Sequence, residues 1–270
     1  MAVKAIVKRW IPAALRRTVF PAGDNEYSGN FTSWAEAARR CSGYDEPSIL
    51  DKTRAALLRV KRGEAVYERD SVLFDRIEYS YPLLAYLLYV ATRCDDRLRV
   101  LDFGGSLGSS YYQNRGCLGQ LREFAWGIVE QAAYVEAGKR DFEDGTLRFF
   151  DSPQACQRTL QPNVLLLSSV LQYLESPLTW LSDAREWGID YIIIDRAPLV
   201  DGAPSRLTIQ TVPPSIYRAR YPCWILNESE MLDALRPRYR LRDAFDVHHG
   251  TTIRLPDAVA RYRGFFLEAA

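Results

Sequence analysis

The sequence contains little histidine and few cysteines, and it carries almost no net charge. Its 270 residues include two His and five Cys, and 35 Lys and Arg stand against 34 Asp and Glu. The cysteines are widely spaced and form no C-x-x-C pair, so neither a disulfide framework nor a metal site is predicted. The net charge of +1 argues against nucleic acid as a partner, because domains that bind nucleic acid are typically strongly basic.

Long apolar runs are also missing. The longest, residues 83–91, is far shorter than the roughly 20 residues that span a bilayer. The N-terminus lacks the apolar core and cleavage site of a signal peptide. With 47% hydrophobic and 26% charged residues, the composition is that of an ordinary globular protein. Disordered, low-complexity and polytopic membrane proteins are therefore excluded, and the scattered cysteines favour a cytoplasmic location.

The charge is unevenly distributed. Residues 1–23 carry five basic residues and no acid, which leaves 30 basic against 34 acidic residues in the remainder, a net charge of −4. Apolar residues in this basic tail recur at helical spacing, although Pro12 interrupts the pattern. A basic amphipathic helix is able to lie on an anionic membrane surface. We therefore expect either peripheral contact at the inner face of the membrane or packing against the body of the protein.

Residues 24–97 are predicted to form a helical N-terminal extension. Ser33 and Glu36 match the capping box that begins a helix. Two further helical patterns follow, at residues 48–63 and 83–91. Between these two patterns lies the polar stretch 64–70, which either folds over the site as a lid or forms a solvated loop.

From residue 98 to the C-terminus, short β-rich runs alternate with helical patterns. The runs lie at residues 98–103, 124–129, 147–150, 164–168 and 191–195. This alternation predicts a Rossmann-like, doubly wound α/β fold with a mostly parallel sheet. Two later runs, 239–247 and 262–267, predict an antiparallel hairpin at the sheet edge. The segment that follows Asp195 and Arg196, up to Arg206, is expected to be irregular and to line an acceptor pocket.

The most informative stretch is a glycine-rich turn after the first of these strands. In an open α/β sheet, ligands bind at the carboxyl ends of the strands, beside such turns. The dinucleotide pattern G-x-G-x-x-G fails, because Phe103 occupies the position of its first glycine. The turn instead carries an acid, Asp102, two residues before its first glycine, Gly104. A carboxylate disfavours a pyrophosphate and favours a cationic ligand such as the sulfonium of S-adenosylmethionine (SAM).

This turn resembles motif I of class I SAM-dependent methyltransferases, whose pattern is Asp/Glu-x-Gly-x-Gly-x-Gly. Asp102, Gly104 and Gly108 match the pattern, while Ser106, beside Gly105, replaces the middle glycine. The resemblance implies SAM as the cofactor and these five residues as cofactor contacts.

Two acids follow the second and third strands of this predicted sheet. Glu130 lies 22 residues after Gly108, close to the spacing at which an acid binds the ribose hydroxyls. Asp151 stands where the methyltransferase family holds the adenine amino group. An N-cap for the following helix is an equally good interpretation of Asp151.

The fourth strand runs into a segment that resembles the methyltransferase motif beneath the methionine part of SAM. Ser168, Ser169 and Gln172 are therefore candidate cofactor contacts. Tyr173 is a candidate for the neighbourhood of the transferred methyl group. Core packing explains Tyr173 equally well.

A second resemblance covers residues 27 to the C-terminus. It rests on four segments, at residues 29–34, 43–45, 68–71 and 101–105, and on Gln210 and residues 217–224. These are similar to a family of methyltransferases encoded in bacterial surface-polysaccharide gene clusters. The resemblance implies that a saccharide or another small molecule is methylated, and it specifies no particular acceptor.

An oxygen acceptor can require a general base. The candidates are His248 or His249, whose alternative is a surface loop, and Asp195, whose alternative is an ion pair with Arg196. Two other functional classes remain open. An NAD-dependent nucleotide-sugar oxidoreductase uses the same fold, but its G-x-G-x-x-G and Tyr-x-x-x-Lys patterns are absent. A non-catalytic membrane-associated scaffold needs only the N-terminal tail.

Overall fold

A computed structural model describes residues 26–41, 47–69, 71–213, 219–247 and 252–270. The basic tail 1–23 and the pair His248 and His249 lie outside these ranges. Among the described residues, no helix is long and apolar enough to cross a membrane.

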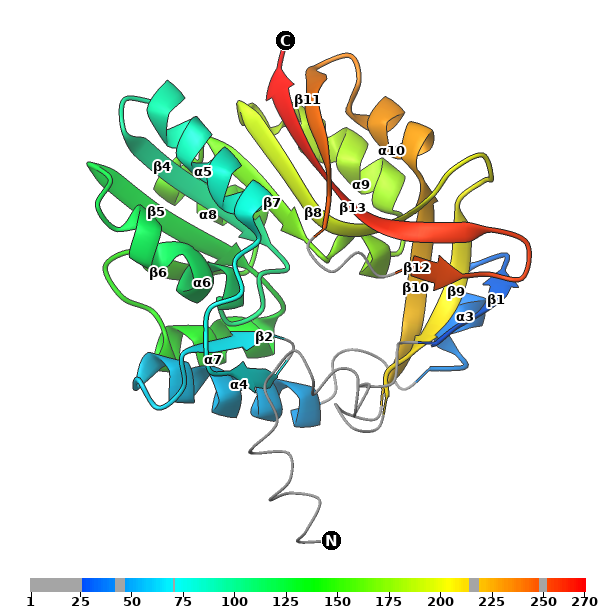
Figure 1. Cartoon of the computed structure of the whole chain (residues 1–270), viewed down its shortest axis with the longest axis horizontal. Coiled ribbons are helices and arrows are strands. Elements are labelled where there is room, and N and C mark those ends of the chain that lie inside the picture. The colour runs from blue at the N-terminus through cyan, green and yellow to red at the C-terminus, as the bar shows by residue number, and fades with distance from the viewer. Residues whose placement is uncertain (1–25, 42–46, 70, 214–218, 248–251) are drawn as a thin grey trace, which may run out of the picture.

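The centre of the molecule is a parallel sheet, as predicted (Figure 1). In spatial order its strands are β8 (Tyr191–Val200), β7 (Val164–Ser168), β4 (Arg97–Phe103), β5 (Glu123–Val129) and β6 (Leu147–Phe150), and every neighbouring pair is parallel. These strands are rich in Val, Ile and Leu because helices cover both faces of the sheet. The doubly wound fold class is confirmed.

The helices bury the two faces in separate cores. On one face, α4 (Pro47–Lys61), α5 (Tyr81–Arg93), α6 (Ser109–Leu118) and α7 (Ala132–Asp141) pack on a core that includes Val100, Leu166 and Ile193. On the other, α8 (Pro153–Leu160), α9 (Pro177–Ala184) and α10 (Glu228–Leu235) pack on Leu101, Leu165 and Ile192. Short 3-10 turns, η1 (Leu171–Tyr173) and η2 (Arg185–Trp187), follow β7 and α9.

The predicted C-terminal hairpin is present and extends the sheet. Strands β11 (Tyr239–Asp246) and β13 (Val259–Ala269) pair antiparallel, and β13 also pairs antiparallel with β8. The short β12 (Thr252–Arg254) pairs with the start of β13.

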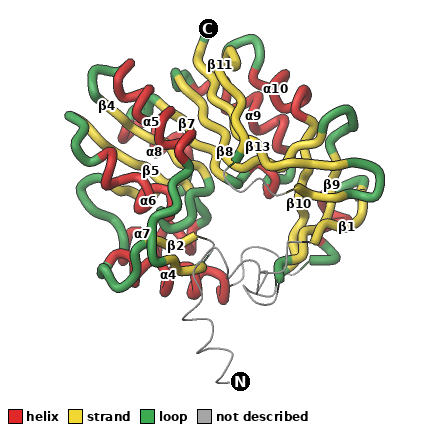
Figure 2. The backbone as a smooth tube through the Cα atoms, viewed as in Figure 1, coloured by secondary structure: helices red, strands yellow, loops and turns green. Residues whose placement is uncertain are grey.

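The sheet forks beyond Asp195, where the sequence predicted an irregular segment. That prediction is wrong as far as Val200, because β8 continues and its end pairs with β10 (Arg220–Asn227). β10 then pairs with β9 (Arg206–Thr211), and β9 with β1 (Glu26–Phe31). These three strands form an antiparallel wing, at the right of the view in Figure 2.

The prediction of an all-helical extension before residue 98 is only partly right. The predicted N-cap is confirmed, because the Ser33 hydroxyl accepts from the Glu36 backbone N–H at the start of α3 (Trp34–Ala38). However, β1 is a strand, and β2 (Tyr67–Arg69) and β3 (Val72–Phe74) form a hairpin. Strand β1 owes its conformation to pairing with β9, far away in the sequence, and local patterns do not report such pairing.

Candidate functional site

The glycine turn after β4 has no room for a side chain at Gly104 or Gly105. Gly104 has φ +71°, and a Cβ there would lie 2.4 Å from Cγ2 of Val170, in the segment after β7. A Cβ on Gly105 would lie 2.5 Å from Oδ2 of Asp102. Gly108 has φ +108° at the N-cap of α6. The glycines therefore allow the backbone to turn tightly against the next strand end.

Asp102 lies beneath this turn rather than on an open rim. Its side chain is 1% exposed, and its Oδ2 accepts from Nε1 of Trp126 at 3.0 Å. Its Oδ1 has no hydrogen-bond partner among the described residues. Burial raises the pKa of Asp102 to about 7, although the Trp126 hydrogen bond opposes the shift. Trp126 was not predicted as a site residue. It lies two residues before Ile128, the partner of Asp102 on β5, so the alternation of side chains would have placed Trp126 on the same face of the sheet as Asp102.

The raised pKa of Asp102 predicts a pH-dependent stability. Between the ordinary pKa of 3.8 and about 7, the folded chain holds a proton that the unfolded chain releases, so stability falls as pH rises. The contribution is at most about 1.4 kcal/mol per pH unit. We expect Asp102→Asn to flatten the fall in unfolding free energy between about pH 5 and pH 7, measured by urea unfolding. Equal slopes for the variant and the wild-type protein would contradict this assignment.

Glu130 faces the same turn from the end of β5. Its Oε1 accepts from the backbone N–H of Ser106 at 3.3 Å, and its Oε2 from that of Gln131 at 2.8 Å. Burial raises the pKa of Glu130, and the two backbone hydrogen bonds oppose the shift. Ser106 is held at φ 54°, which is uncommon for a residue other than glycine. The structure therefore brings two predicted site residues, Ser106 and Glu130, into contact.

Strand register places four predicted residues on one face of the sheet. Asp102 is aligned with Ile128 on β5 and with Leu166 on β7. Ser168 and Asp195 lie two residues beyond the aligned pair Leu166 and Ile193, and Glu130 lies two beyond Ile128. Because strand side chains alternate between faces, all four project on the side of α5, α6 and α7.

A polar network occupies the ends of β7 and β8. The Ser168 hydroxyl donates to Oδ2 of Asp195 at 2.9 Å and accepts from Arg196 at 3.0 Å. Nε of Arg196 lies 3.3 Å from the same Oδ2, so the predicted alternative of an ion pair is confirmed. Nε2 of Gln172 donates to the Ser169 hydroxyl at 3.0 Å. Gln172 is fully buried, and its Oε1 has no partner among the described residues.

Tyr173 points from η1 toward the antiparallel wing. Its hydroxyl donates to Oε1 of Gln210 at 3.0 Å, and its ring packs edge-on against Tyr221. Tyr27, Gln210 and Tyr221 are directly opposite one another on β1, β9 and β10, so they share one face. Tyr27 also shares a 2.6 Å hydroxyl–hydroxyl hydrogen bond with Tyr262. Tyr173 thus joins Tyr27, Tyr221 and Tyr262 in a group of tyrosines around Gln210 on one face of the wing, which we call the aromatic row.

Asp151 is exposed at the end of β6 and accepts from the Ser152 hydroxyl at 3.0 Å. The alternative role of Asp151 as N-cap is wrong, because Ser152 occupies that position at the start of α8. Asp151 remains a candidate adenine contact. The candidate bases His248 and His249 lie outside the described residues.

A buried acid, Glu68, connects the β2–β3 hairpin to helix α6. Glu68 is 1% exposed, and its Oε2 accepts from the hydroxyl of Ser109, the first residue of α6, at 2.6 Å. Its Oε1 accepts from the Ser71 backbone N–H. The alternative of a solvated loop is therefore wrong for Glu68, while Asp70 lies outside the described residues.

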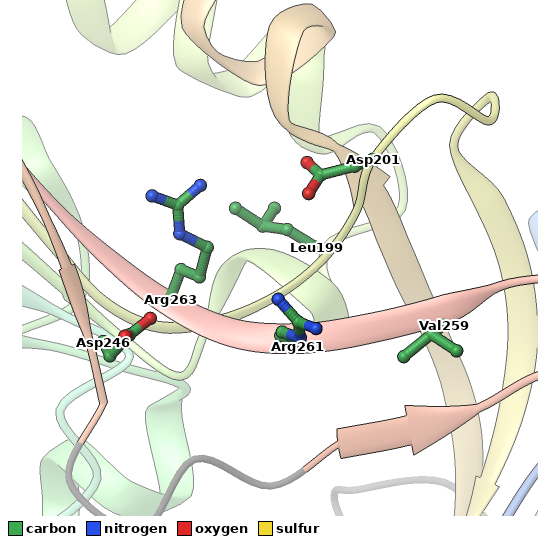
Figure 3. Close-up of a pocket in the computed structure, with 6 residues that line it drawn as sticks. All are labelled: Leu199, Asp201, Asp246, Val259, Arg261 and Arg263. Carbon is green, nitrogen blue, oxygen red and sulfur yellow. The ribbon is translucent and has the colours of Figure 1, made fainter.

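An open pocket of about 290 Å³ lies elsewhere, along β13 (Figure 3). It is lined by Leu199, Asp201, Asp246, Val259, Arg261 and Arg263. Arg261 and Arg263 alternate with Tyr262, so they lie on the opposite face of the strand from the aromatic row. None of the predicted site residues lines this pocket. In the part of the chain that the structure describes, no group of His, Cys, Asp and Glu could hold a metal ion.

The sheet order and the glycine turn at its carboxyl edge define a Rossmann-like α/β protein. Neither the protein-family models nor the curated proteins give a match to the sequence.

Solved structures of similar fold include 1,6-didemethyltoxoflavin-N1-methyltransferase of Burkholderia thailandensis, with bound 1,6-didemethyltoxoflavin and S-adenosylhomocysteine (SAH). It is 15% identical over 85% of this chain and 95% of its own, with a TM-score of 0.42. The N-terminal domain of EvdMO1, solved with SAH and D-fucose, is 13% identical over 80% and 97%, with a TM-score of 0.48. Magnesium protoporphyrin IX methyltransferase of Synechocystis PCC 6803, with bound SAM, is 10% identical over 85% and 99%, with a TM-score of 0.42.

Proposed function

We propose that the protein is a SAM-dependent methyltransferase that acts on a saccharide or another small molecule. The observation that carries the proposal is the glycine turn between two acids, the buried Asp102 beneath it and the half-buried Glu130 facing it. The site presents carboxylate oxygens, which accept hydrogen bonds and repel a phosphate. It suits a ligand that combines a ribose with a positive charge better than it suits a pyrophosphate.

The residues present fit SAM. Two buried oxygens, Oδ1 of Asp102 and Oε1 of Gln172, lack donors among the described residues, and an ammonium group supplies several. Glu130 would accept from the ribose hydroxyls, and Asp151 from the adenine amino group. Gly104 and Gly105 let the turn pack directly against Val170 and Asp102, and this packing holds the backbone of the turn beside the two acids.

SAM supplies an electrophilic methyl group on a sulfonium. The chain's own residues orient the acceptor and exclude water, which carry most of the rate in an in-line displacement. Ser168, Ser169 and Gln172 hold the strand ends beside the turn. Tyr173 would position the acceptor from the aromatic row.

A saccharide acceptor is supported by the resemblance to surface-polysaccharide methyltransferases and by the aromatic row. The half-buried rings of Tyr27, Tyr173 and Tyr262 carry hydroxyl groups and suit a sugar, which presents both apolar C–H and polar O–H edges. His248, His249 and Asp195 are the candidate bases. Mass shifts of one methylene in glycans from cells with and without the gene test this acceptor class.

Calorimetry tests the cofactor. We expect the folded protein to bind SAM and SAH and not NAD. Binding of NAD alone would favour the oxidoreductase class. Binding of none of the three by a protein that unfolds cooperatively would favour a non-catalytic scaffold.

We further propose a cytoplasmic location with peripheral membrane contact through residues 1–23. The five basic residues of this tail are each expected to contribute about 1 kcal/mol of attraction to an anionic surface. Removal of residues 1–20 should therefore abolish co-sedimentation with anionic liposomes and leave SAH binding intact. Retained liposome binding by the truncated chain would overturn the membrane proposal.

A further inference from the structure

Strand β8 carries a bulge next to the proposed cofactor site. Against β13, Ile194 is aligned with Phe265 but Ala197 with Arg263, so Asp195 and Arg196 together face Gly264 alone. A Cβ on Gly264 would lie 2.2 Å from the ring of Phe245, so this partner position has no room for a side chain. Bulges of this kind redirect side chains and are frequent beside active sites.

The bulge belongs to a rim of three unusual backbone conformations. Ser106, Ser169 and Arg196 have φ values of 54°, 59° and 57°, and they follow the ends of β4, β7 and the β7-paired part of β8. The Ser169 backbone N–H donates to the carbonyl of Asp195 at 2.8 Å, which ties Ser169 to the residue before Arg196. Left-handed conformations of residues other than glycine cluster at ligand sites, where the surroundings hold them in place.

Within this rim, the Asp195 side chain is only half satisfied. It is 2% exposed, and Ser168 and Arg196 both engage its Oδ2. Its Oδ1 has no hydrogen-bond partner among the described residues. Arg196 offsets the cost of burying the charge, but a carboxylate oxygen buried without a donor remains unfavourable. A donor from a ligand would remove this cost.

The position of Asp195 suggests which part of a ligand supplies that donor. Glu130 and Asp195 share one face and lie on β5 and β8, three strands apart. At about 4.8 Å per strand spacing, this separation is roughly 14 Å. If the ribose lies at Glu130, the other end of the cofactor extends across the glycine turn toward β7 and β8.

We propose that Asp195 lies at the methyl-transfer end of the site and takes the proton of the acceptor. This inference rests on the proposed function. The acceptor oxygen or nitrogen forms its bond to the methyl carbon as the carbon–sulfur bond breaks. The sulfur keeps the electron pair, and the acceptor's proton passes to Oδ1 of Asp195. The acceptor is therefore a hydroxyl or amine that carries a proton, and Ser168 and Arg196 act as positioning residues.

Sinefungin tests the assignment without a known acceptor. It carries an amine in place of the transferred methyl group and otherwise keeps the amino-acid and nucleoside parts of SAH. We expect the wild-type protein to bind sinefungin more tightly than SAH in calorimetry. Asp195→Asn should reduce this preference about tenfold or more, the value of a charge-assisted hydrogen bond, and leave SAH affinity unchanged. Asp190→Asn, an exposed acid at the other end of β8, is the matched control and should keep the preference.

The remaining outcomes are distinguishable. If the wild-type protein binds neither ligand, the proposed function fails. If Asp195→Asn weakens both ligands equally, Asp195 binds the amino-acid part and the inference is wrong; an unchanged preference also overturns it. Should the single variant not fold, the double variant Asp195→Asn with Arg196→Gln removes both charges of the ion pair together. It is judged by the same preference.

Discussion

Replacement of Glu130 by Gln is expected to weaken SAH binding about ten- to a hundredfold. Both carboxylate oxygens already accept from backbone N–H groups, at Ser106 and Gln131, which fixes the carboxylate against the glycine turn. An amide keeps only one acceptor oxygen and loses the charge. Charge-assisted hydrogen bonds to a diol contribute roughly 1.5–3 kcal/mol, which corresponds to this loss of affinity.

The same substitution should leave the protein at least as stable as before. Burial raises the pKa of Glu130, so at neutral pH the charged group costs stability that a neutral amide does not. Glu123→Gln, at the opposite end of β5, is the matched control and should bind SAH like the wild-type protein. Calorimetry and thermal unfolding measure both effects. Wild-type affinity in Glu130→Gln would remove Glu130 from the ribose site.

Replacement of Gly104 by Ala is expected to destabilise the protein by about 2–5 kcal/mol. The left-handed backbone costs an alanine about 1–2 kcal/mol. The new Cβ, 2.4 Å from Val170, adds about 1–3 kcal/mol of overpacking. Val170 lies in the segment after β7, two residues before the candidate cofactor contact Gln172. Relief of the clash should therefore displace both the glycine turn and this segment, and reduce SAH binding more than tenfold.

Gly116→Ala is the matched control for this substitution. Gly116 lies inside α6, and a Cβ there meets no atom within 4 Å. Alanine forms helices better than glycine by up to about 1 kcal/mol, so this variant should be slightly more stable and bind SAH normally. Urea unfolding and calorimetry compare the pair. Equal behaviour of the two variants would show that the turn tolerates a side chain.

The strands of the parallel sheet were predictable because their pattern is local. Four of the five predicted runs match the observed strands to within one residue, since each reads as a short apolar run bounded by a turn. The glycine turn and Glu130 were predictable for the same reason, because a short spacing in one βαβ unit fixes them. Strand β1 was not predictable, because its six residues, EYSGNF, become a strand only against β9.

For the site residues too, local sequence patterns predicted the positions, and long-range packing determined the surroundings. The sequence placed Asp102 beside the turn, but its burial, its hydrogen bond to Trp126 and its raised pKa depend on how β4 and β5 pack. Asp195 was predicted either as a base or as the partner of Arg196 in an ion pair, and its hydrogen bond with Ser168 was not predicted. Its contact with Ser168 comes from the register of β7 and β8, whereas the bulge at Asp195 and Arg196 arises from pairing with β13, about seventy residues later.

For this protein, the amino-acid sequence was sufficient for the fold class, the order of the core elements and the position of the glycine turn. Those properties follow from periodicity and spacing over tens of residues. The forked sheet, the aromatic row, the seat of Glu68 on α6 and the half-satisfied Asp195 required three-dimensional packing. They depend on contacts between segments far apart in the chain, and no local sequence pattern reports which distant segments come together.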